Sequence, residues 1–166
     1  MIYHYFGGKE GLYLASLEHV YLDVRRAEQA LELSAAPPAE GMRRFVDFTF
    51  DHFSRHTEFI GMLVSENLAL ARYLRRSKIV PGLTPPLRAA IQDLLERGER
   101  EKVFRPGVDA VQLFVSIHAL CYLHVANRHT LSAMFRIDLS DPRWLIERRR
   151  HVHDMVSSYL RVQEPA

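Results

Sequence analysis

The sequence predicts an all-α protein with about six long helices. Apolar residues recur at helical spacing among charged residues, which is the pattern of amphipathic helices. Prolines and glycines gather in the short breaks between these segments, where they end one helix or begin the next. No segment alternates apolar and polar residues as a half-buried β-strand does. These observations favour helices packed on helices around one core.

The first half of the chain is expected to hold three of these helices. Residues 9–33 carry one apolar stripe among charged side chains, and residues 34–38 (SAAPP) break the pattern. Residues 38–56 follow, with phenylalanines on more than one side, so this helix should be buried on several sides. The third helix is expected over residues 58–77, and its basic last turn complements the helix dipole.

The second half begins with a cap-plus-proline signal. Thr84 offers a hydroxyl N-cap ahead of Pro85, which predicts a helix to about residue 102. Asp109 can cap a helix over residues 109–127, the least polar segment, which should be covered all round. After a shorter helical piece at 130–135, Asp141 and Pro142 begin the last helix, over residues 142–162.

Length and composition limit the possible classes of protein. The chain has 166 residues, enough for one domain with a proper core. A net charge of +2 is too small to argue for nucleic-acid binding by itself. Cys121 is the single cysteine, which excludes an internal disulfide and fits a reducing compartment. The sequence shows no signal peptide and no apolar run of the ~20 residues that span a membrane, so we expect a cytoplasmic protein.

The first dozen residues, MIYHYFGGKEGL, indicate the end of one helix, a two-glycine break and the start of another. Lys9 places a positive charge beside the new helix N-terminus, a combination that suits a phosphate. The run IYHYF, followed after two residues by KE and then by Leu12, resembles the junction of recognition helix and linker helix in TetR-family transcriptional repressors. Gly8 stands where that family usually has a Ser, Asn or Asp cap.

The resemblance implies an organisation in three parts. Residues 1–8 would be a remnant of the DNA recognition helix, residues 9–33 the linker helix, and residues 34–166 the C-terminal ligand-binding and dimerisation domain. Tyr3, Tyr5 and Lys9 match family positions that contact the DNA backbone. His4 falls where some relatives also approach DNA, and the alternative for it is simple exposure to solvent. Most of the helix-turn-helix is expected to be missing, so operator DNA should be a partner only if the preceding helices are present.

The resemblance also implies a mechanism and an assembly. In the family, effector binding shifts the linker helix, which changes the spacing of the two recognition helices and lowers operator affinity. The last two helices pair with those of a second copy in a four-helix bundle, so the chain should form a homodimer. We expect the dimer interface on one side of the last helix, at Leu145, Val152, Met155, Val156 and Tyr159.

Polar residues on otherwise apolar helices mark the expected effector pocket. Buried polar groups cost roughly 1–3 kcal/mol each unless they are paired. These residues could pair with one another, or they could line a cavity that takes a small apolar or aromatic effector, as the family role suggests. The candidates are Phe48, His52, Leu63, Glu66, Asn67, His118 and Tyr122. No cofactor is expected.

Other chemistries receive weaker support from the sequence. His52 and His56 lie four apart, but nothing nearby completes a metal-binding set, and His151 and His153 diverge around their helix. An all-α enzyme would need His52, His118 or Glu66 as its acid or base. We therefore expect no metal site and no enzyme. The main alternative is a stand-alone helical module that binds small molecules or dimerises without DNA.

Overall fold

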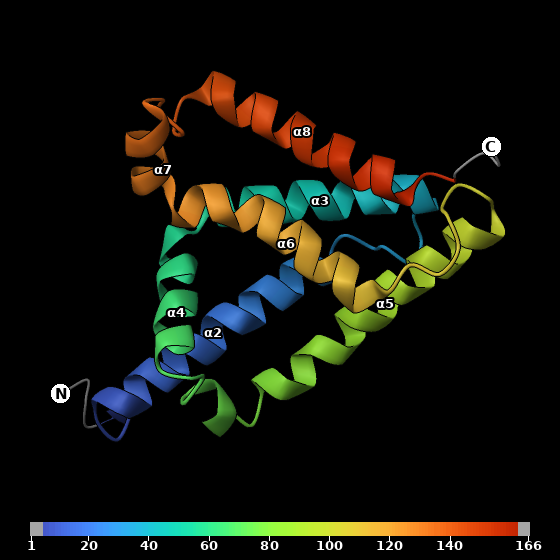
Figure 1. Ribbon diagram of the computed structural model, residues 1–166. Coiled ribbons are helices and arrows are strands. Elements are labelled where there is room, and N and C mark those ends of the chain that lie inside the picture. The colour runs from blue at the N-terminus through green and yellow to red at the C-terminus, as the bar shows by residue number, and fades with distance from the viewer. Residues whose placement is uncertain (1–4, 163–166) are drawn as a thin grey trace.

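The computed structural model describes residues 5–162, and within that range the chain forms helices and turns without a β-strand (Figure 1). The all-α prediction is therefore confirmed. The helices are α2 (Lys9–Gln29), α3 (Pro38–Arg55), α4 (Thr57–Leu68), the 3₁₀ helix η1 (Leu74–Arg76), α5 (Val80–Arg100), α6 (Ala110–Ala126), α7 (Arg128–Phe135) and α8 (Pro142–Leu160).

Helix α3 occupies the centre of the arrangement and packs against α4, α5, α6 and α8 (Figure 1). On the side away from α8, α2 packs against α5. The phenylalanines of α3 explain this central position: Phe45, Phe50 and Phe53 are all buried. Burial of α3 on several sides, predicted from its aromatic residues, is thus confirmed, and the core is continuous around this one helix.

The two-glycine break before α2 also agrees with prediction. Gly7 and Gly8 have φ angles of 70° and 114°, a region that favours glycine, and α2 begins directly after them. Gly11 lies so close to the preceding turn that an added Cβ would stand 1.8 Å from the Phe6 carbonyl oxygen. The chain therefore enters α2 at an angle that glycines make possible.

The third predicted helix is shorter than the sequence indicated. Helix α4 ends at Leu68, and Leu70 and Ala71 take positive φ angles of 54° and 58°, which redirect the chain. Glu66 holds this turn, because its Oε2 accepts a hydrogen bond from the Leu74 backbone N–H at 2.9 Å. The apolar pattern continued beyond Leu68 and gave no sign of the left-handed residues that interrupt it.

Helix α5 begins five residues earlier than predicted, at Val80 instead of Pro85. The Ser77 hydroxyl accepts hydrogen bonds from the backbone N–H groups of Ile79 and Val80 at 3.2 and 3.1 Å, and so satisfies donors at the helix start. Pro85 and Pro86 lie inside the helix within its second turn. A serine three residues before the helix thus replaces the predicted threonine cap.

The later helix starts are as predicted. Asp109 accepts a hydrogen bond from the Gln112 N–H, and Asp141 accepts one from the Arg143 N–H, each at 2.7 Å. Helices α6 and α7 meet at a bend of 72°. Within residues 5–162, no single helix is both long and apolar enough to cross a membrane.

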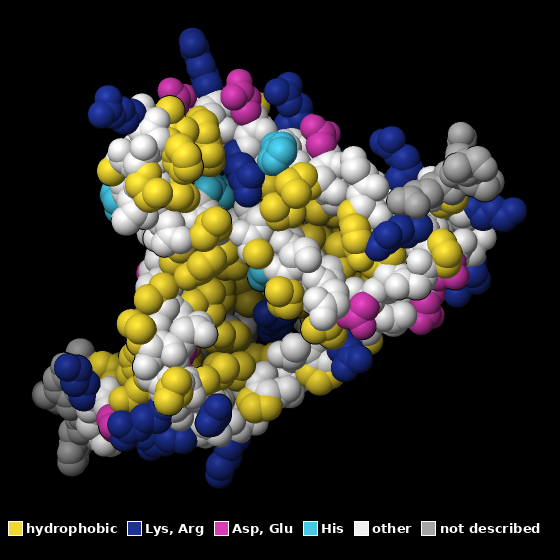
Figure 2. All heavy atoms as spheres, in the orientation of Figure 1, with side chains coloured by type: hydrophobic (Ala, Val, Ile, Leu, Met, Phe, Trp, Pro, Cys, Tyr) yellow, Lys and Arg dark blue, Asp and Glu magenta, His cyan; other side chains and the backbone are white. Residues whose placement is uncertain are grey.

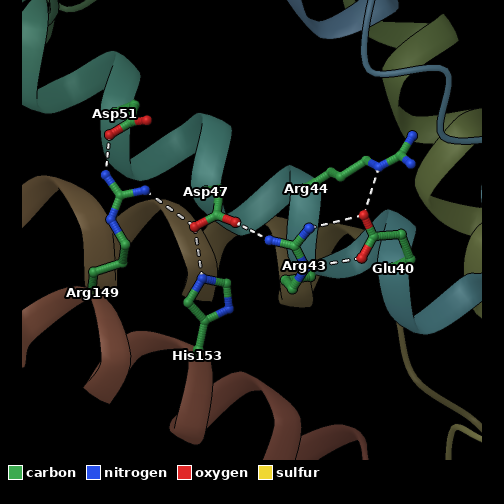
Figure 3. A network of polar contacts seen from close by, with 7 residues as sticks. All are labelled: Glu40, Arg43, Arg44, Asp47, Asp51, Arg149 and His153. Atoms are coloured by element: carbon green, nitrogen blue, oxygen red, sulfur yellow. Dashed lines mark hydrogen bonds and ion pairs between the residues drawn. The ribbon is translucent and has the colours of Figure 1, made fainter. Parts of the chain in front are cut away.

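Figure 3 shows the polar contacts that hold α8 along α3. The Arg149 guanidinium donates to Asp47 at 3.2 Å and also to Asp51, and His153 Nε2 lies 2.9 Å from Asp47. Arg43 continues the network on α3 by bonding both Asp47 and Glu40. These contacts fix the position of α8, which turns one of its faces to the core.

Candidate functional site

A cavity of about 450 Å³ lies between α2, α3, α4, α5 and α6. Figure 2 shows this side of the molecule hollowed between α4, α5 and α6, with hydrophobic walls and with basic and histidine side chains visible inside. Its volume lies in the range of small-molecule pockets. The lining consists of Tyr21, Val24, Arg25, Glu28, Phe48, Thr49, His52, Phe53, Phe59, Leu63, Leu74, Arg75, Val80, Pro81, Thr84, Phe114 and His118.

Aromatic rings from four helices form much of the wall. Phe59 of α4 meets Tyr21 of α2 edge-on with ring centroids 5.7 Å apart, and it stacks on Phe53 of α3 at 6.2 Å. Phe114 and His118 of α6 stack at 3.7 Å. Such a wall offers flat apolar surfaces at several angles, which suits a planar or aromatic ligand.

Both histidines of the cavity are neutral near pH 7. Burial lowers the pKa of His52 to about 4 and does the same for His118. His118 Nδ1 lies 3.0 Å from the Phe114 carbonyl oxygen, whereas His52 Nε2 is buried without a hydrogen-bond partner among the described residues. The histidines can therefore donate or accept hydrogen bonds inside the cavity but bring no charge to it.

A buried ion pair on α2 contributes the charges. Arg25 Nη1 lies 2.6 Å from Glu28 Oε2, and only 12% and 4% of the two side chains are exposed. Burial raises the pKa of Glu28 to about 7, although the nearby Arg25 favours the carboxylate. The pair also lines a second cavity of about 410 Å³ between α2, the segment after it and α5. Arg25 and Glu28 thus form a partition between two hollows.

Sequence reasoning missed this pair. A signal was available, because Glu28 continues the spacing of Leu17, Tyr21 and Val24 on the inner face of α2. A carboxylate at an apolar position of an amphipathic stripe is a buried charge that needs a partner. Arg25, three residues before it, was the obvious one.

The predicted effector residues divide into two groups. Phe48, His52, Leu63 and His118 line the cavity. Three others lie elsewhere: Glu66 beneath the turn after α4, Asn67 on the surface with its amide donating to the Leu63 carbonyl, and Tyr122 edge-on against Phe53. Asn67 and one oxygen of Glu66 thus pair with the backbone, whereas Glu66 Oε1 is buried without a hydrogen-bond partner among the described residues. Contact of any of these residues with an effector stays a prediction.

The described side chains are not arranged as a metal site or as an acid–base pair. The rings of His52 and His56 are 4.7 Å apart, but the described residues contain no group of three or more His, Cys, Asp or Glu side chains placed to hold a metal. Glu66 does not line the cavity, so it shares no site with His52 and His118. Cys121 is fully buried, and burial raises its pKa to about 12, which makes the thiol unreactive.

The residues predicted to contact DNA lie at the start of the chain. Tyr5 is 85% exposed and Lys9 is exposed at the first position of α2. Both are therefore accessible to a phosphate backbone. Tyr3 and His4 lie outside the described residues. All four contacts stay predictions.

The predicted dimer residues occupy two different faces of α8. Val152 and Val156 are buried in the core of their own chain, and Leu145 is half-buried. Only Met155 and Tyr159 face outward, each 45% exposed. The prediction did not separate the two faces, because both of them carry apolar residues.

Helix α6 carries the more continuous outward stripe. Val111, Val115 and Leu123 are 44%, 55% and 50% exposed, and their spacing in steps of four or eight places them on one side. The prediction that this helix is covered all round is therefore not met within one chain. The described chain leaves an apolar face uncovered beside α8, to which α6 is tied by the Arg148 bond to the Leu120 carbonyl.

Comparison with known proteins adds two findings. Residues 38–156 match the family model described as the tetracyclin repressor-like C-terminal domain. The chain is also similar to the HTH-type transcriptional repressor NicS of Pseudomonas putida (strain KT2440), with 36% identity over 141 residues. That alignment covers 85% of this chain and 66% of NicS, so the chain spans slightly less than two thirds of its relative.

Proposed function

This chain belongs to the TetR family of transcriptional regulators, and we propose that it is the sensing part of a ligand-responsive repressor that acts in the cytoplasm. In this proposal the aromatic cavity binds a small effector and the outer faces of α6 and α8 form a homodimer. Operator DNA is a partner of the protein when a complete helix-turn-helix precedes these residues. Family membership disfavours the stand-alone module as an alternative, and the proposed role is binding without catalysis.

The observation that carries the proposal is the cavity itself. Most of its lining belongs to residues 38–156, which match the tetracyclin repressor-like C-terminal domain, and α2 supplies the rest. The cavity is mostly apolar with a few buried polar groups. Four residues singled out from the sequence, Phe48, His52, Leu63 and His118, lie on its wall. We propose these as effector contacts, together with the aromatic rings of Tyr21, Phe59 and Phe114.

The connection between the cavity and α2 supports a route for the signal. The segment after α4 contributes Leu74 and Arg75 to the cavity wall. The same segment is bound to the start of α2, because Arg72 and Arg76 donate to Glu10 at 3.2 and 3.0 Å. A ligand that displaces this segment would also move the N-terminal end of α2, the element that corresponds to the linker helix.

A dimer through α6 and α8 would cover the apolar surface that one chain leaves exposed. In a two-fold interface each subunit buries the same patch. The stripe of Val111, Val115 and Leu123 on each chain would therefore be buried against the other chain. Met155 and Tyr159 extend the patch onto α8. Val152 and Val156 would not contact the second chain, but their packing in the core would hold α8 in position.

Binding of a neutral fluorescent probe tests whether the cavity accepts ligands. N-phenyl-1-naphthylamine is apolar and aromatic, and we expect it to bind the wild-type chain with enhanced emission. The variant Leu63→Trp places a larger side chain in the cavity and should weaken binding at least about tenfold. Val64→Trp adds the same ring to the next position of α4, which does not line the cavity, and should bind like wild type. Equal affinity of both variants, with helix content preserved, would show that the probe binds elsewhere.

A further inference from the structure

The charges of the main cavity are unbalanced. Among the described residues, three charged side chains line it: Arg25, Arg75 and Glu28. Both histidines on the wall are neutral near pH 7, as argued above, so they do not alter this balance. An otherwise apolar cavity with two guanidinium groups and one carboxylate favours a ligand that carries negative charge.

Arg25 has unused hydrogen-bonding capacity. Its Nε atom is buried and has no hydrogen-bond acceptor among the described residues. Its Nη1 atom lies 2.6 Å from Glu28 Oε2, but the two groups do not form a well-aligned hydrogen bond. A guanidinium has five N–H donors in a planar fork that fits the two oxygens of a carboxylate. Leaving buried donors of a cation unpaired is costly, so the site gains most from a ligand that supplies acceptors.

Glu28 is a counter-ion that can be released. Its Oε2 atom lies in the ion pair with Arg25 without a well-aligned hydrogen bond, and burial raises the pKa of the group to about 7. The neutral acid is therefore within easy reach near physiological pH. Because Glu28 can take up a proton, Arg25 can exchange it for another anion without leaving a second buried charge behind.

We propose, building on the effector-binding function above, that the cavity binds an aromatic carboxylate whose carboxyl group replaces Glu28 as the partner of Arg25. The ring lies against the aromatic wall of Tyr21, Phe59 and Phe114, which contributes flat apolar surface. Arg75, exposed at the edge of the cavity, adds positive potential along the approach. Glu28 takes up a proton from solvent as the ligand enters.

Calorimetric titration with 2-naphthoate and its neutral counterpart 2-naphthamide tests the charge preference. The two probes share a ring system and differ in charge, so their affinity ratio isolates the carboxylate. We expect wild type to favour naphthoate by at least about tenfold, and Arg25→Gln to reduce that ratio to about threefold or less. Arg26→Gln, an exposed neighbour outside both cavities, should keep the wild-type ratio.

The proton uptake gives a second readout on the unaltered chain. The groups that line the two cavities around Glu28 are Tyr21, Arg25 and Glu32 from α2 and its end, His52 from α3, Arg75 from η1 and His118 from α6. Glu32 is exposed, the histidines have pKa values of about 4, and burial raises the pKa of Tyr21. At about pH 8 only Glu28 can gain a proton, so naphthoate should bind with uptake of more than about half a proton, measured in buffers of different ionisation enthalpy.

The outcomes separate this inference from the proposed function. If naphthamide binds as tightly as naphthoate, or if naphthoate binds without proton uptake, the carboxylate inference is overturned. The proposed function survives that result provided that N-phenyl-1-naphthylamine binds and Leu63→Trp weakens its binding at least about tenfold. If none of the three probes binds the cavity, both proposals fail. The wild-type measurements decide the matter even where Arg25→Gln does not fold.

Discussion

At the scale of single residues, burial of Glu28 links the stability of the fold to pH. Its pKa is about 7 in the folded protein, against 4.5 for the unfolded reference, so the folded state holds a proton that the unfolded state has lost between these values. The free energy of unfolding contributed by this group therefore falls as pH rises from about 4.5 to about 7. At pH values above that window, the folded protein carries the full cost of a buried carboxylate.

Removing the ionisable group tests this link. Glu28→Gln keeps the size of the side chain and an oxygen for Arg25, and should raise the free energy of unfolding near pH 8 by up to about 3 kcal/mol. Near pH 4.5 the free energy of unfolding of the variant should be close to that of the wild type. The comparison is made by urea unfolding across this range, with Glu99→Gln on the exposed face of α5 as the control. A gain that is the same at both ends of the range would contradict a raised pKa at Glu28.

Some residue roles could be predicted and others could not. Asp109 and Asp141 cap their helices as predicted, because a helix N-terminus has a local signature of an acceptor side chain before the first turn. Glu66 and Asn67 were expected in the pocket, but their environment depends on where α4 ends. The positive φ angles at Leu70 and Ala71 that end it leave no pattern in the sequence.

At the scale of elements, Arg149 connects α8 to α3. Its guanidinium bonds Asp47 and Asp51 (Figure 3). It also lies 4.8 Å from the centre of the Phe50 ring. The three groups are partly buried, so screening by solvent reduces but does not remove their interaction. The position of α8, and with it one face of the proposed dimer, depends on these contacts.

Truncation of Arg149 measures how much this connection contributes. Arg149→Ala leaves two carboxylates without their shared cation and should lower the free energy of unfolding by about 1–3 kcal/mol in low salt, with a smaller loss in high salt. Arg150→Ala removes an exposed neighbour of the same type and should change stability by less than about 0.5 kcal/mol. Equal effects of the two variants would mean that the network in Figure 3 adds nothing specific to Arg149.

The helices themselves could be predicted closely from periodicity and breaks, except around residues 69–84. There the apolar pattern runs across a turn, and prolines inside α5 imitate a helix start. The decisive residue, Ser77, bonds the N–H groups of Ile79 and Val80 and also donates to Glu18 of α2 at 2.7 Å. A contact between segments that far apart in the sequence cannot be inferred from local spacing.

At the scale of the whole molecule, the exposed apolar faces of α6 and α8 form the proposed dimer interface. The sequence identified α6 as too apolar to face water, and the structure shows which part of it the chain itself leaves uncovered. The sequence alone could not assign Val152 and Val156 to the core, because α8 carries apolar residues on both faces. The cavity likewise could not be predicted in outline, since five helices and the segment around η1 contribute to it.

The central claim is that these residues form the dimeric sensor of a TetR-family regulator, and sedimentation velocity tests it most directly. At micromolar concentration the wild-type chain should sediment as a dimer. Val115→Glu places a charge in the middle of the proposed two-fold interface and should weaken the dimer at least about 100-fold. Leu68→Glu, at an exposed site at the end of α4, should remain dimeric. A wild-type monomer at these concentrations, or a Val115→Glu variant that stays dimeric, would contradict the account.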